Sequence, residues 1–494
     1  MDLRELLRVM SLSAAMLYAA HFLGYLTRVL FARVLTTEEY GMFYALIGFF
    51  MFFAVFRSFG MSPTLIHFIP KYRSEGQKLR YMLWITFLFQ VLVGVVAFLL
   101  FFGLSGQIAE YIFHDPGVTF LVQIHAITFV LIGFARYFHS ILRGMQRHML
   151  SAAYDTVRLF FVLACTSVLL LLGKFTLTAL VLVWMFSYLF IILVYQPFLI
   201  PLYRKTRSVS AEKFPRIRKE LIGYAVPLML GIAADIILSR SDVVLLTFFR
   251  GVSEVALYEI AHPASQLLLL FVSAFSFVVF PVVSKLHYSK NQQRIRDLFS
   301  GAYNAGLYLV APVFVMLMVY PEIVIRLIFG EKYLAAAPAL QIFTAGTLFL
   351  VFAQINFNIL QGVGEVKRRT RILYFVAIFN IVLDIAAIIY FGYIGAIVVT
   401  SVSFAIMWFL SYRACIQHLE LDLRIRAMGK IILSAALFAA IVVIMKNSIS
   451  GIPVFLEAGL IGAISAGVYF IFGTLVLKVI DPKILMRLLR SRRK

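Results

Sequence analysis

The chain has 494 residues, of which 62% are hydrophobic and only 14% are charged, and its mean hydropathy is +0.95. Soluble domains are about half apolar and about a quarter charged, so this composition excludes an ordinary water-soluble protein and predicts a polytopic membrane protein. A net charge of +22 would suit nucleic-acid binding only if the basic residues gathered on one soluble face, but they fall in short clusters between long apolar runs. Cys165 and Cys415 lie far apart in apolar stretches and predict neither a disulfide framework nor a metal site.

The apolar runs are long enough to cross a bilayer. A membrane-spanning helix needs about 20 apolar residues, and this criterion predicts an all-α protein of about fourteen spans. In chain order the spans fall at residues 9–31, 41–69, 82–104, 118–142, 152–172, 177–199, 221–249, 252–280, 301–320, 335–360, 372–391, 394–416, 431–445 and 454–477.

The loops between these spans alternate in charge. Lys and Arg collect in every second loop, as at 71–80, 204–219 and 367–371, whereas 105–117 contains neither. Cytoplasmic loops are the ones that collect basic residues. The pattern therefore predicts that both termini are cytoplasmic and that the protein lies in the cell (plasma) membrane with several passes.

The first twelve spans contain an internal duplication. Three fragment pairs recur at offsets of 215, 216 and 218, namely residues 39–43 with 254–258, 111–114 with 327–330, and 142–146 with 360–364. Each unit holds six spans, and an even number leaves both units in the same orientation, as in several transporter folds. The duplication therefore predicts two parallel six-helix lobes with a cleft between them.

The same pattern sets the expected domain boundaries. We expect an N-lobe at 1–200 and a basic cytoplasmic linker at 201–220. The C-lobe follows at 221–417, and residues 418–494 hold spans 13 and 14 with a basic C-terminal tail.

Short motifs in the chain resemble those of a known transporter family. They are Arg33-Val-Leu-Thr-Thr-Glu-Glu-Tyr-Gly41, Phe59-Gly-Met61, Phe68-Ile-Pro-Lys-Tyr72, Leu142-Arg-Gly-Met-Gln-Arg147, Asp242-Val-Val-Leu-Leu246, Phe329-Gly-Glu-Lys-Tyr333 and Ile359-Leu-Gln-Gly-Val-Gly-Glu365. Together they resemble the polysaccharide-export flippases of the multidrug/oligosaccharidyl-lipid/polysaccharide exporter superfamily. The resemblance covers spans 1 to 12. It implies a fourteen-helix transporter that moves lipid-linked oligosaccharides outward by alternating access.

Two arginines of the N-lobe lie within predicted spans, where an ionisable group usually faces a cavity or a partner. Arg57 is near the middle of span 2, too far from either end to reach water, and its alternative is an acidic partner on a neighbouring helix. Arg28 is nearer the end of span 1, where its side chain could extend to the membrane surface. Tyr18, His21, Tyr25 and Arg28 follow spacings of three, four and three, which predict one polar and aromatic helix face.

Carboxylates dominate the later spans. Asp235 and Asp242 are seven residues apart on span 7, and Arg240 points away from Asp235 unless Pro227 breaks that helix. Asp384 lies four residues after Asn380 on span 11. A purely structural Arg28–Asp242 ion pair is the alternative to a functional role. For Arg136 with His139, and for Asp155 with Arg158, the expectation is interfacial anchoring and a local ion pair.

The leading hypothesis is a flippase for a polyprenyl-diphosphate-linked oligosaccharide used in cell-surface polysaccharide or glycoconjugate assembly. Guanidinium groups bind phosphate with paired donors and stay protonated at any relevant pH, so Arg57 and Arg28 are expected to hold the diphosphate, with Arg240 assisting. His21 and Tyr25, on the same face of span 1 as Arg28, would form part of the hydrated wall of the cleft. Asp235, Asp242 or Asp384 would bind a coupling proton or sodium ion, with no other cofactor. Expected partners are the lipid-linked glycan, membrane lipid and membrane enzymes of glycan assembly, but no nucleic acid.

Three alternatives remain open at this point. A cation-coupled multidrug antiporter needs acidic groups in the cleft, and the cationic first lobe disfavours it. A lipid II flippase of the same superfamily differs little from the leading hypothesis in sequence. A membrane glycan polymerase or other enzyme usually carries a large external loop or an acidic metal motif, and the sequence has no Asp-x-Asp and no His-Glu-x-x-His. The expectation is therefore a transporter and not an enzyme.

Overall fold

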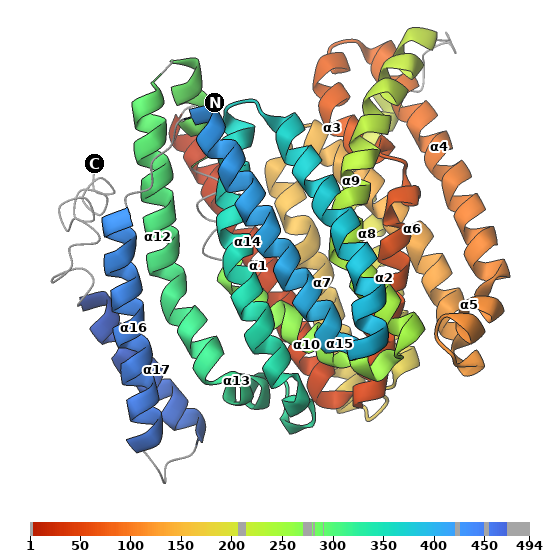
Figure 1. The fold of residues 1–494 in the computed structure, drawn as a ribbon. Helices are drawn as coiled ribbons and strands as arrows, with labels where there is room; N and C mark the ends of the chain where they lie inside the picture. The colour runs from red at the N-terminus through yellow and green to blue at the C-terminus, as the bar shows by residue number, and fades with distance from the viewer. Residues whose placement is uncertain are drawn as a thin grey trace. The chain divides into compact units, whose positions relative to one another are not determined.

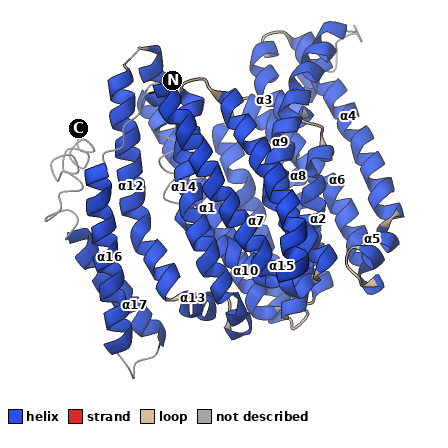
Figure 2. Cartoon of the chain, viewed as in Figure 1, coloured by secondary structure: helices blue, strands red, loops and turns tan. Residues whose placement is uncertain are grey.

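The structure of the chain is a computed structural model that describes residues 3–205, 214–269, 279, 282–289, 291–419, 425–448 and 454–471. Every regular element in these ranges is a helix (Figures 1 and 2). The chain divides into two compact units, Met1–Ala256 and Leu257–Lys494, and the division falls within one helix.

The first unit contains long helices joined by short turns. Its elements are α1 (Leu3–Val34), α2 (Thr37–Phe52), the 3-10 helix η1 (Phe53–Arg57), α3 (Met61–Tyr72), α4 (Gly76–Gly103), α5 (Ser105–Tyr111), η2 (Pro116–Val118), α6 (Thr119–Gly144), α7 (His148–Leu171), α8 (Leu177–Lys205), α9 (Pro215–Phe249) and the start of α10 (Val252–Ser265). Within this unit α1 packs on α7, α6 packs on α4 and α8, and α9 packs on α2 and α3.

The second unit is also helical throughout its described part. Its elements are the remainder of α10, η3 (Gln266–Leu268), α12 (Gln292–Val319), α13 (Pro321–Ile328), η4 (Glu331–Ala336), α14 (Ala337–Gly362), α15 (Val366–Leu419), α16 (Ile425–Ser448) and α17 (Val454–Ile471). The 54-residue α15 is interrupted at Gly392, whose φ of 60° and ψ of −142° are not helical, so it comprises two successive helices.

The described residues contain ten helices that are long and apolar enough to cross a membrane. One of these segments, Val366–Gln417, covers both predicted spans 11 and 12. Predicted spans 8 and 14 continue into 270–278 and 472–477, which lie outside the described residues, as do linker residues 206–213 and the tail from residue 478. The multi-pass membrane class is confirmed. The count of fourteen spans, the orientation of the termini and the predicted domain boundaries stay predictions.

The second span differs from its prediction, because residues 41–69 do not form one helix. After α2 the chain tightens into η1, and Ser58 leaves helical geometry with a φ of −149°. Phe59 and Gly60 then adopt left-handed φ values of 47° and 76° before α3 begins. Non-helical backbone at membrane depth is tolerated only where it is buried in protein or lines a cavity. The segment 53–60 therefore interrupts the second span inside the protein, and we call it the helix break.

Neighbouring helices donate a hydrogen bond to the helix break and pack closely around it. The Gln90 side chain of α4 donates a hydrogen bond of 3.0 Å to the carbonyl oxygen of Arg57. A Cβ atom on Gly60 would lie 2.5 Å from the carbonyl oxygen of Ala225 in α9. This close approach, together with the positive φ, explains why glycine is needed at residue 60.

The motif that opens the second span has a structural basis. The Thr36 hydroxyl accepts a hydrogen bond from the Glu39 backbone N–H (3.1 Å), and the Glu39 carboxylate accepts one from the Thr36 backbone N–H (2.9 Å). This is a capping box, which satisfies two of the donors left unpaired at a helix start. Farther along α2, Gly48 allows close contact with Val243 of α9.

The predicted duplication recurs in the backbone conformation. His114 and Gly330, which are 216 residues apart, both have positive φ values (54° and 106°), and so do Gln146 and Gly364, which are 218 apart (59° and 87°). Residues with positive φ are uncommon outside glycine. Positive φ therefore recurs at equivalent positions of the two copies, even where the residue is His114 or Gln146.

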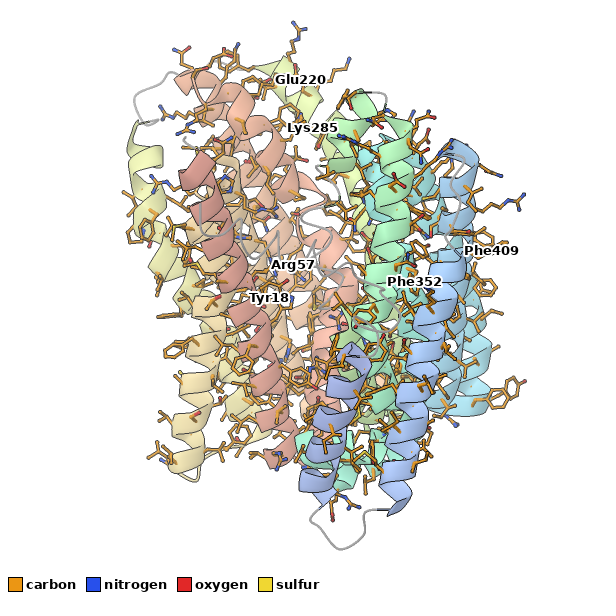
Figure 3. The ribbon with its side chains drawn as sticks, turned by 90° about the vertical axis from the view of Figure 1, so that its left-hand side faces the viewer. Tyr18, Arg57, Glu220, Lys285, Phe352 and Phe409 are labelled. Atoms are coloured by element: carbon orange, nitrogen blue, oxygen red, sulfur yellow. The ribbon has the colours of Figure 1, made fainter. Side chains whose placement is uncertain are left out.

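A polar contact joins α3 to α9 at one end of the first unit. Lys71 lies 2.6 Å from the Glu220 carboxylate, and the Tyr72 hydroxyl donates to the same carboxylate at 2.7 Å. The hydrogen bond to Glu220 raises the pKa of Lys71. Figure 3 shows Glu220 at this end of the helices, whereas Arg57 lies about midway along them.

The last two described helices pack against α12. The Tyr469 hydroxyl donates to the carbonyl oxygen of Tyr308 at 3.0 Å, and the Tyr308 hydroxyl donates to the carbonyl oxygen of Phe470 at 3.2 Å. Ile431, Phe438 and Ile461 complete this buried apolar cluster. The helices predicted as spans 13 and 14 therefore pack on the second unit.

We predict that Gly60→Ala destabilises the protein. The left-handed backbone and the Ala225 carbonyl oxygen both oppose a Cβ atom, so the free energy of unfolding should fall by about 1–3 kcal/mol. Thermal unfolding of the purified protein in detergent measures this loss. Gly76→Ala is the matched control, because a Cβ atom there meets nothing within 4 Å. Equal melting temperatures for the two variants would contradict the proposed geometry of the helix break.

We also predict that Gln90→Leu destabilises the helix break. The substitution leaves the Arg57 carbonyl oxygen without its hydrogen-bond donor, which should cost about 1–3 kcal/mol. Hydrogen exchange of the backbone amides of residues 55–61 should accelerate. Gln123→Leu serves as the control, since Gln123 donates only to the Ser105 hydroxyl (3.3 Å). The prediction fails if both variants exchange at the wild-type rate over residues 55–61.

Candidate functional site

The first unit contains a cavity of about 390 Å³ whose walls come from α1, α2, α7, α8 and α9. Its polar lining differs from the apolar helices around it. The charged and aromatic residues that line it are His21, Arg28, Phe31, Tyr44, Asp155, Arg158, Trp184 and Arg240. Leu17, Ala20, Gly24, Thr27, Ile47, Met51 and Leu159 complete the wall. We refer to this space as the arginine cavity.

Helix α1 presents one face to the arginine cavity. The lining positions from Leu17 to Phe31 include His21 and Arg28, as the sequence predicts, but neither Tyr18 nor Tyr25. At about 100° per residue, the cavity-facing arc is centred to one side of His21, and Tyr25 lies roughly 100° from that centre. The predicted polar and aromatic face of α1 is therefore rotated about the helix axis relative to the face that lines the cavity. Tyr25 is not on the described cavity wall.

His21 has a defined orientation. Its Nδ1 lies 2.8 Å from the carbonyl oxygen of Leu17, one turn earlier in α1. A carbonyl oxygen only accepts, so in the neutral ring Nδ1 carries the hydrogen and Nε2 is an acceptor. His21 can therefore accept a hydrogen bond from a sugar hydroxyl in the arginine cavity.

Aromatic rings of α2 support Arg28. The guanidinium carbon lies 4.1 Å from the centroid of the Tyr44 ring, and Nη1 is 3.5 Å from the Tyr40 hydroxyl. A cation over an aromatic face is stabilised by the ring quadrupole, more strongly where water is excluded. This contact holds Arg28 at the cavity wall.

Arg158 is the most deeply buried cation of the arginine cavity, and its side chain is only 8% exposed. Its Nε lies 3.8 Å from an oxygen of Asp155, one turn earlier in α7. The guanidinium carbon lies 4.8 Å from the ring of Trp184 and 4.6 Å from that of Tyr188, both on α8. Within the described part of the chain, Nε and Nη1 have no hydrogen-bond partner. Arg158 therefore has donors available for a ligand.

The expected local ion pair of Asp155 and Arg158 is present, but these residues also line the arginine cavity. Sequence position places them near the start of span 5, which suggested an interfacial role. They line the cavity because α7 packs on α1, where the Thr156 hydroxyl donates a hydrogen bond to the carbonyl oxygen of Met16 at 2.7 Å. That contact depends on tertiary packing.

Electrostatically, the described lining of the arginine cavity favours an anion. It carries three guanidinium groups, Arg28, Arg158 and Arg240, against one carboxylate, Asp155. Guanidinium groups bind phosphate oxygens with paired donors. Trp184 and Tyr44 add flat apolar faces beside them. The wall can therefore hold a phosphate group and an attached planar or cyclic group.

Arg57 occupies a separate position at the end of η1. Its guanidinium carbon lies 5.0 Å from the Phe129 ring of α6, and Nε and Nη2 are buried without a hydrogen-bond partner among the described residues. No described carboxylate forms an ion pair with it. Arg57 does not appear on the wall of the arginine cavity. The described wall of the arginine cavity therefore contains Arg28 but not Arg57.

The acidic residues of α9 have different environments. Asp235 is exposed, whereas Asp242 is only 1% exposed and lies 3.4 Å from the Ser241 hydroxyl. Arg240 lines the arginine cavity, and neither aspartate does. This agrees with the angular separation expected between Arg240 and Asp235. The Arg28–Asp242 ion pair stays a prediction.

The second unit contains a buried polar cluster in α15. Asp384 and Asn380 are fully buried, and the Asn380 amide donates to the Thr400 hydroxyl at 3.3 Å. The Asn380 side-chain oxygen has no hydrogen-bond partner among the described residues. Oxygen atoms of carboxylate, amide and hydroxyl groups suit a proton or a hard cation.

A second polar network in this unit is already satisfied. Asn356 of α14 accepts a hydrogen bond from the Tyr303 hydroxyl at 2.7 Å and donates to the Ser411 hydroxyl at 2.9 Å. These contacts join α12, α14 and α15. Asn356 therefore serves the packing of helices. The described residues contain no group of three or more His, Cys, Asp or Glu side chains that could hold a metal ion.

Comparisons with known proteins place the chain in a family. Residues 6–287 match the model of the polysaccharide biosynthesis protein family, and residues 227–386 match the MatE model. An uncharacterised membrane protein of Methanocaldococcus jannaschii is 28% identical over 93% of this chain and 94% of its own length. The probable low-salt glycan biosynthesis flippase Agl15 of Haloferax volcanii is 27% identical over 34% of this chain and 36% of its own length.

Solved structures show the same fold. The lipid II flippase MurJ in an inward closed conformation has a TM-score of 0.74 at 18% identity, covering 94% of this chain and 99% of its own. An inward-facing multidrug resistance MATE transporter of the MOP superfamily has a TM-score of 0.68 at 12% identity, covering 81% and 95%. The chain therefore belongs to the polysaccharide biosynthesis protein family, within the multidrug/oligosaccharidyl-lipid/polysaccharide flippase superfamily of multi-pass membrane proteins.

Proposed function

We propose that the protein is a flippase that moves a polyprenyl-diphosphate-linked oligosaccharide from the cytoplasmic to the outer leaflet by alternating access. The observation that carries this proposal is the arginine cavity, whose described lining sets three guanidinium groups against one carboxylate among apolar helices. A diphosphate must be shielded from hydrocarbon during passage, because charged groups are costly in the bilayer. Partial sequence similarity to two proteins of Haloferax volcanii, a probable low-salt glycan biosynthesis flippase and a probable flippase, supports the substrate class.

In this proposal Arg158 and Arg28 hold the diphosphate. Arg158 supplies two buried donors, and Arg28 is fixed by the Tyr44 ring. Arg240 contributes further positive charge from α9. Trp184 would contact the face of the first sugar, and His21 Nε2 would accept a hydrogen bond from one of its hydroxyl groups. The polyprenyl tail would remain in lipid.

Arg57 would serve as a second phosphate contact, away from the arginine cavity. Its guanidinium has no described carboxylate partner, and it is attached to backbone that is not part of a regular α-helix. Rotation at Phe59 and Gly60 could reorient Arg57 without unfolding α2 or α3. This role replaces the expectation that Arg57 and Arg28 clamp one diphosphate together.

Two alternatives in the transporter class receive different support. A cation-coupled multidrug antiporter is disfavoured, because a wall with three arginines repels organic cations. The fold does not distinguish a lipid II flippase from the leading proposal. The similarity to MurJ, at 18% identity, concerns the fold alone. Lipid II is therefore included as a separate substrate in the assay below.

We further propose that Asp384 is the coupling residue. It is fully buried beside Asn380 on α15, and the Asn380 side-chain oxygen is available as a further ligand. Protonation or sodium binding would neutralise the carboxylate, which lowers the cost of keeping it buried. Asp235 is exposed and Asp242 packs within the first unit, so Asp384 is the better candidate for a site that is dehydrated between binding events.

We predict that Arg28→Ala and Arg158→Ala each slow flipping of a fluorescent polyprenyl-diphosphate oligosaccharide in proteoliposomes at least about tenfold, because a hydrogen bond to a charged group is worth about 1.5–3 kcal/mol. Arg28→Lys should retain part of the activity, since lysine keeps the charge but loses the paired donors. Arg33→Ala on the same helix is the control, because Arg33 is exposed and does not line the arginine cavity.

Melting temperatures measured in parallel separate loss of function from loss of folding. Wild-type flipping rates in well-folded Arg28→Ala and Arg158→Ala proteins would disprove the proposed binding site. Faster transport of lipid II than of the oligosaccharide would favour the alternative flippase. Transport of organic cations would favour the antiporter.

For coupling, we predict that Asp384→Asn abolishes the stimulation of flipping by a proton or sodium gradient while leaving substrate binding intact. The asparagine is permanently neutral and so mimics one state of the carboxylate. Flipping is measured with each gradient applied separately, and Asp235→Asn is the control because Asp235 is exposed. A full gradient response in Asp384→Asn would rule out this residue as the coupling site.

A further inference from the structure

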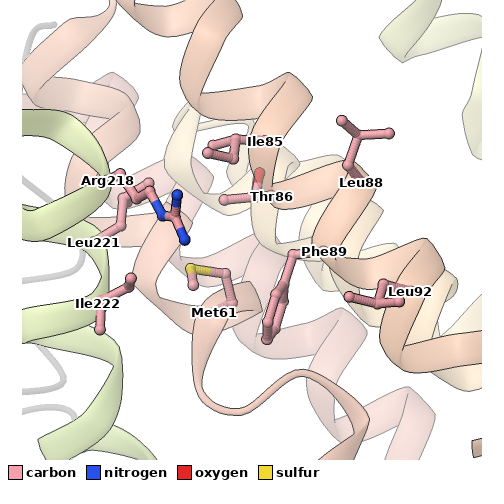
Figure 4. Close-up of a pocket in the computed structure, with 9 residues that line it drawn as sticks. All are labelled: Met61, Ile85, Thr86, Leu88, Phe89, Leu92, Arg218, Leu221 and Ile222. Carbon is pink, nitrogen blue, oxygen red and sulfur yellow. The ribbon is translucent and has the colours of Figure 1, made fainter. Parts of the chain in front are cut away.

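A second cavity, of about 350 Å³, lies between α3, α4 and α9 in the first unit (Figure 4). Its described lining is apolar except for Thr86 and Arg218. The apolar residues are Met61, Ile85, Leu88, Phe89, Leu92, Leu221 and Ile222. Figure 4 shows the Arg218 guanidinium pointing from α9 toward α3 and α4, above Met61. We refer to this space as the Arg218 cavity.

The charge of Arg218 is not neutralised by the nearby acid. Glu220 already contacts Lys71 at 2.6 Å, the Tyr72 hydroxyl at 2.7 Å and Arg216 at 3.8 Å. Two residues correspond to roughly 200° around a helix, so Arg218 and Glu220 point in nearly opposite directions. No described carboxylate lies within ion-pair distance of Arg218.

The position of the Arg218 cavity suits an amphiphilic ligand. Arg218 lies in the first turn of α9, within the basic segment 204–219 that the charge pattern assigns to the cytoplasmic side. Leu88 and Leu92, one turn apart on α4, are 47% and 61% exposed, and they extend the apolar wall away from Arg218. The cavity therefore offers a cation at the membrane surface and an apolar groove directed into the bilayer.

We propose that the Arg218 cavity binds an anionic phospholipid of the cytoplasmic leaflet. The phosphate would accept hydrogen bonds from the Arg218 guanidinium, and one acyl chain would lie along Leu88 and Leu92. Charge complementarity selects an anionic lipid, because a zwitterionic headgroup brings its own cation close to Arg218. This site is separate from the arginine cavity, and no lining residue belongs to both.

The bound lipid would act on the helix break. Met61 is the first residue of α3 after Gly60, and the Phe89 ring lies 6.2 Å from the Phe59 ring. Thr86, one turn before Gln90 on α4, lines the cavity, and Gln90 holds the Arg57 carbonyl oxygen. A lipid in the Arg218 cavity would therefore contact α3, which follows the break, and α4, which holds the Arg57 carbonyl oxygen, and would limit movement of the break.

The test measures association of spin-labelled phosphatidylglycerol and phosphatidylcholine with the purified protein in phosphatidylcholine vesicles. Arg218→Ala should lower the preference for phosphatidylglycerol about fivefold, because one basic residue near an anionic surface contributes about 1 kcal/mol. Arg216→Ala is the matched control. Its side chain is 93% exposed and lies beside Glu220, so the preference should change less than twofold.

Filling the groove separates a bound lipid from general attraction to a basic surface. Leu88→Trp keeps every charge but narrows the Arg218 cavity, and it should also lower the preference, whereas Leu99→Trp on the same helix should not. Hydrogen exchange of residues 55–61 should slow when phosphatidylglycerol is added to the wild type but not to Arg218→Ala. Equal losses in Arg216→Ala and Arg218→Ala, or an unchanged preference in Leu88→Trp, would overturn the proposal. Both readouts are independent of flipping.

Discussion

The structure of the first unit depends on one constraint: a guanidinium group stays protonated and is costly in hydrocarbon unless protein or water surrounds it. Arg28 and Arg158 meet this constraint through aromatic faces and a shared cavity. Arg57 meets it at an interrupted helix, against the Phe129 ring. The packing of α1, α2, α7, α8 and α9 therefore encloses positive charge. Burying this charge is costly and would not help a protein to bind apolar or cationic ligands.

The helix break lies between residues that line the two cavities: Met51 lines the arginine cavity and Met61 lines the Arg218 cavity. Backbone groups that leave helical geometry inside a membrane need new partners, and here Gln90 provides one for the Arg57 carbonyl oxygen. The same α4 carries part of the wall of the Arg218 cavity, so the proposed lipid and a substrate at Arg57 would both act on residues 53–60. Its two left-handed residues make the break a place where the backbone could change conformation in the proposed transport cycle.

Much of the architecture could be predicted from sequence, because hydropathy, charge alternation and short motifs are local properties. The membrane class and the family are confirmed, and positive φ values recur at two pairs of positions related by the predicted repeat. The helix break could not be placed, because the run from residue 41 to 69 is apolar enough for one span, although Gly60 and Pro63 were available as signals. That Arg158 lines the arginine cavity, whereas Tyr25 is not on its described wall, could not be predicted, because helix rotation and the α1–α7 contact are tertiary properties.

We propose that the arginine cavity receives the diphosphate of a lipid-linked glycan. The most direct measurement is an electron cryomicroscopy structure of the protein with a polyprenyl-diphosphate disaccharide. We expect diphosphate density within hydrogen-bond distance of the Arg158 and Arg28 guanidinium groups, with the first sugar beside Trp184. Diphosphate density elsewhere, with the arginine cavity occupied only by protein side chains or water, would contradict the account.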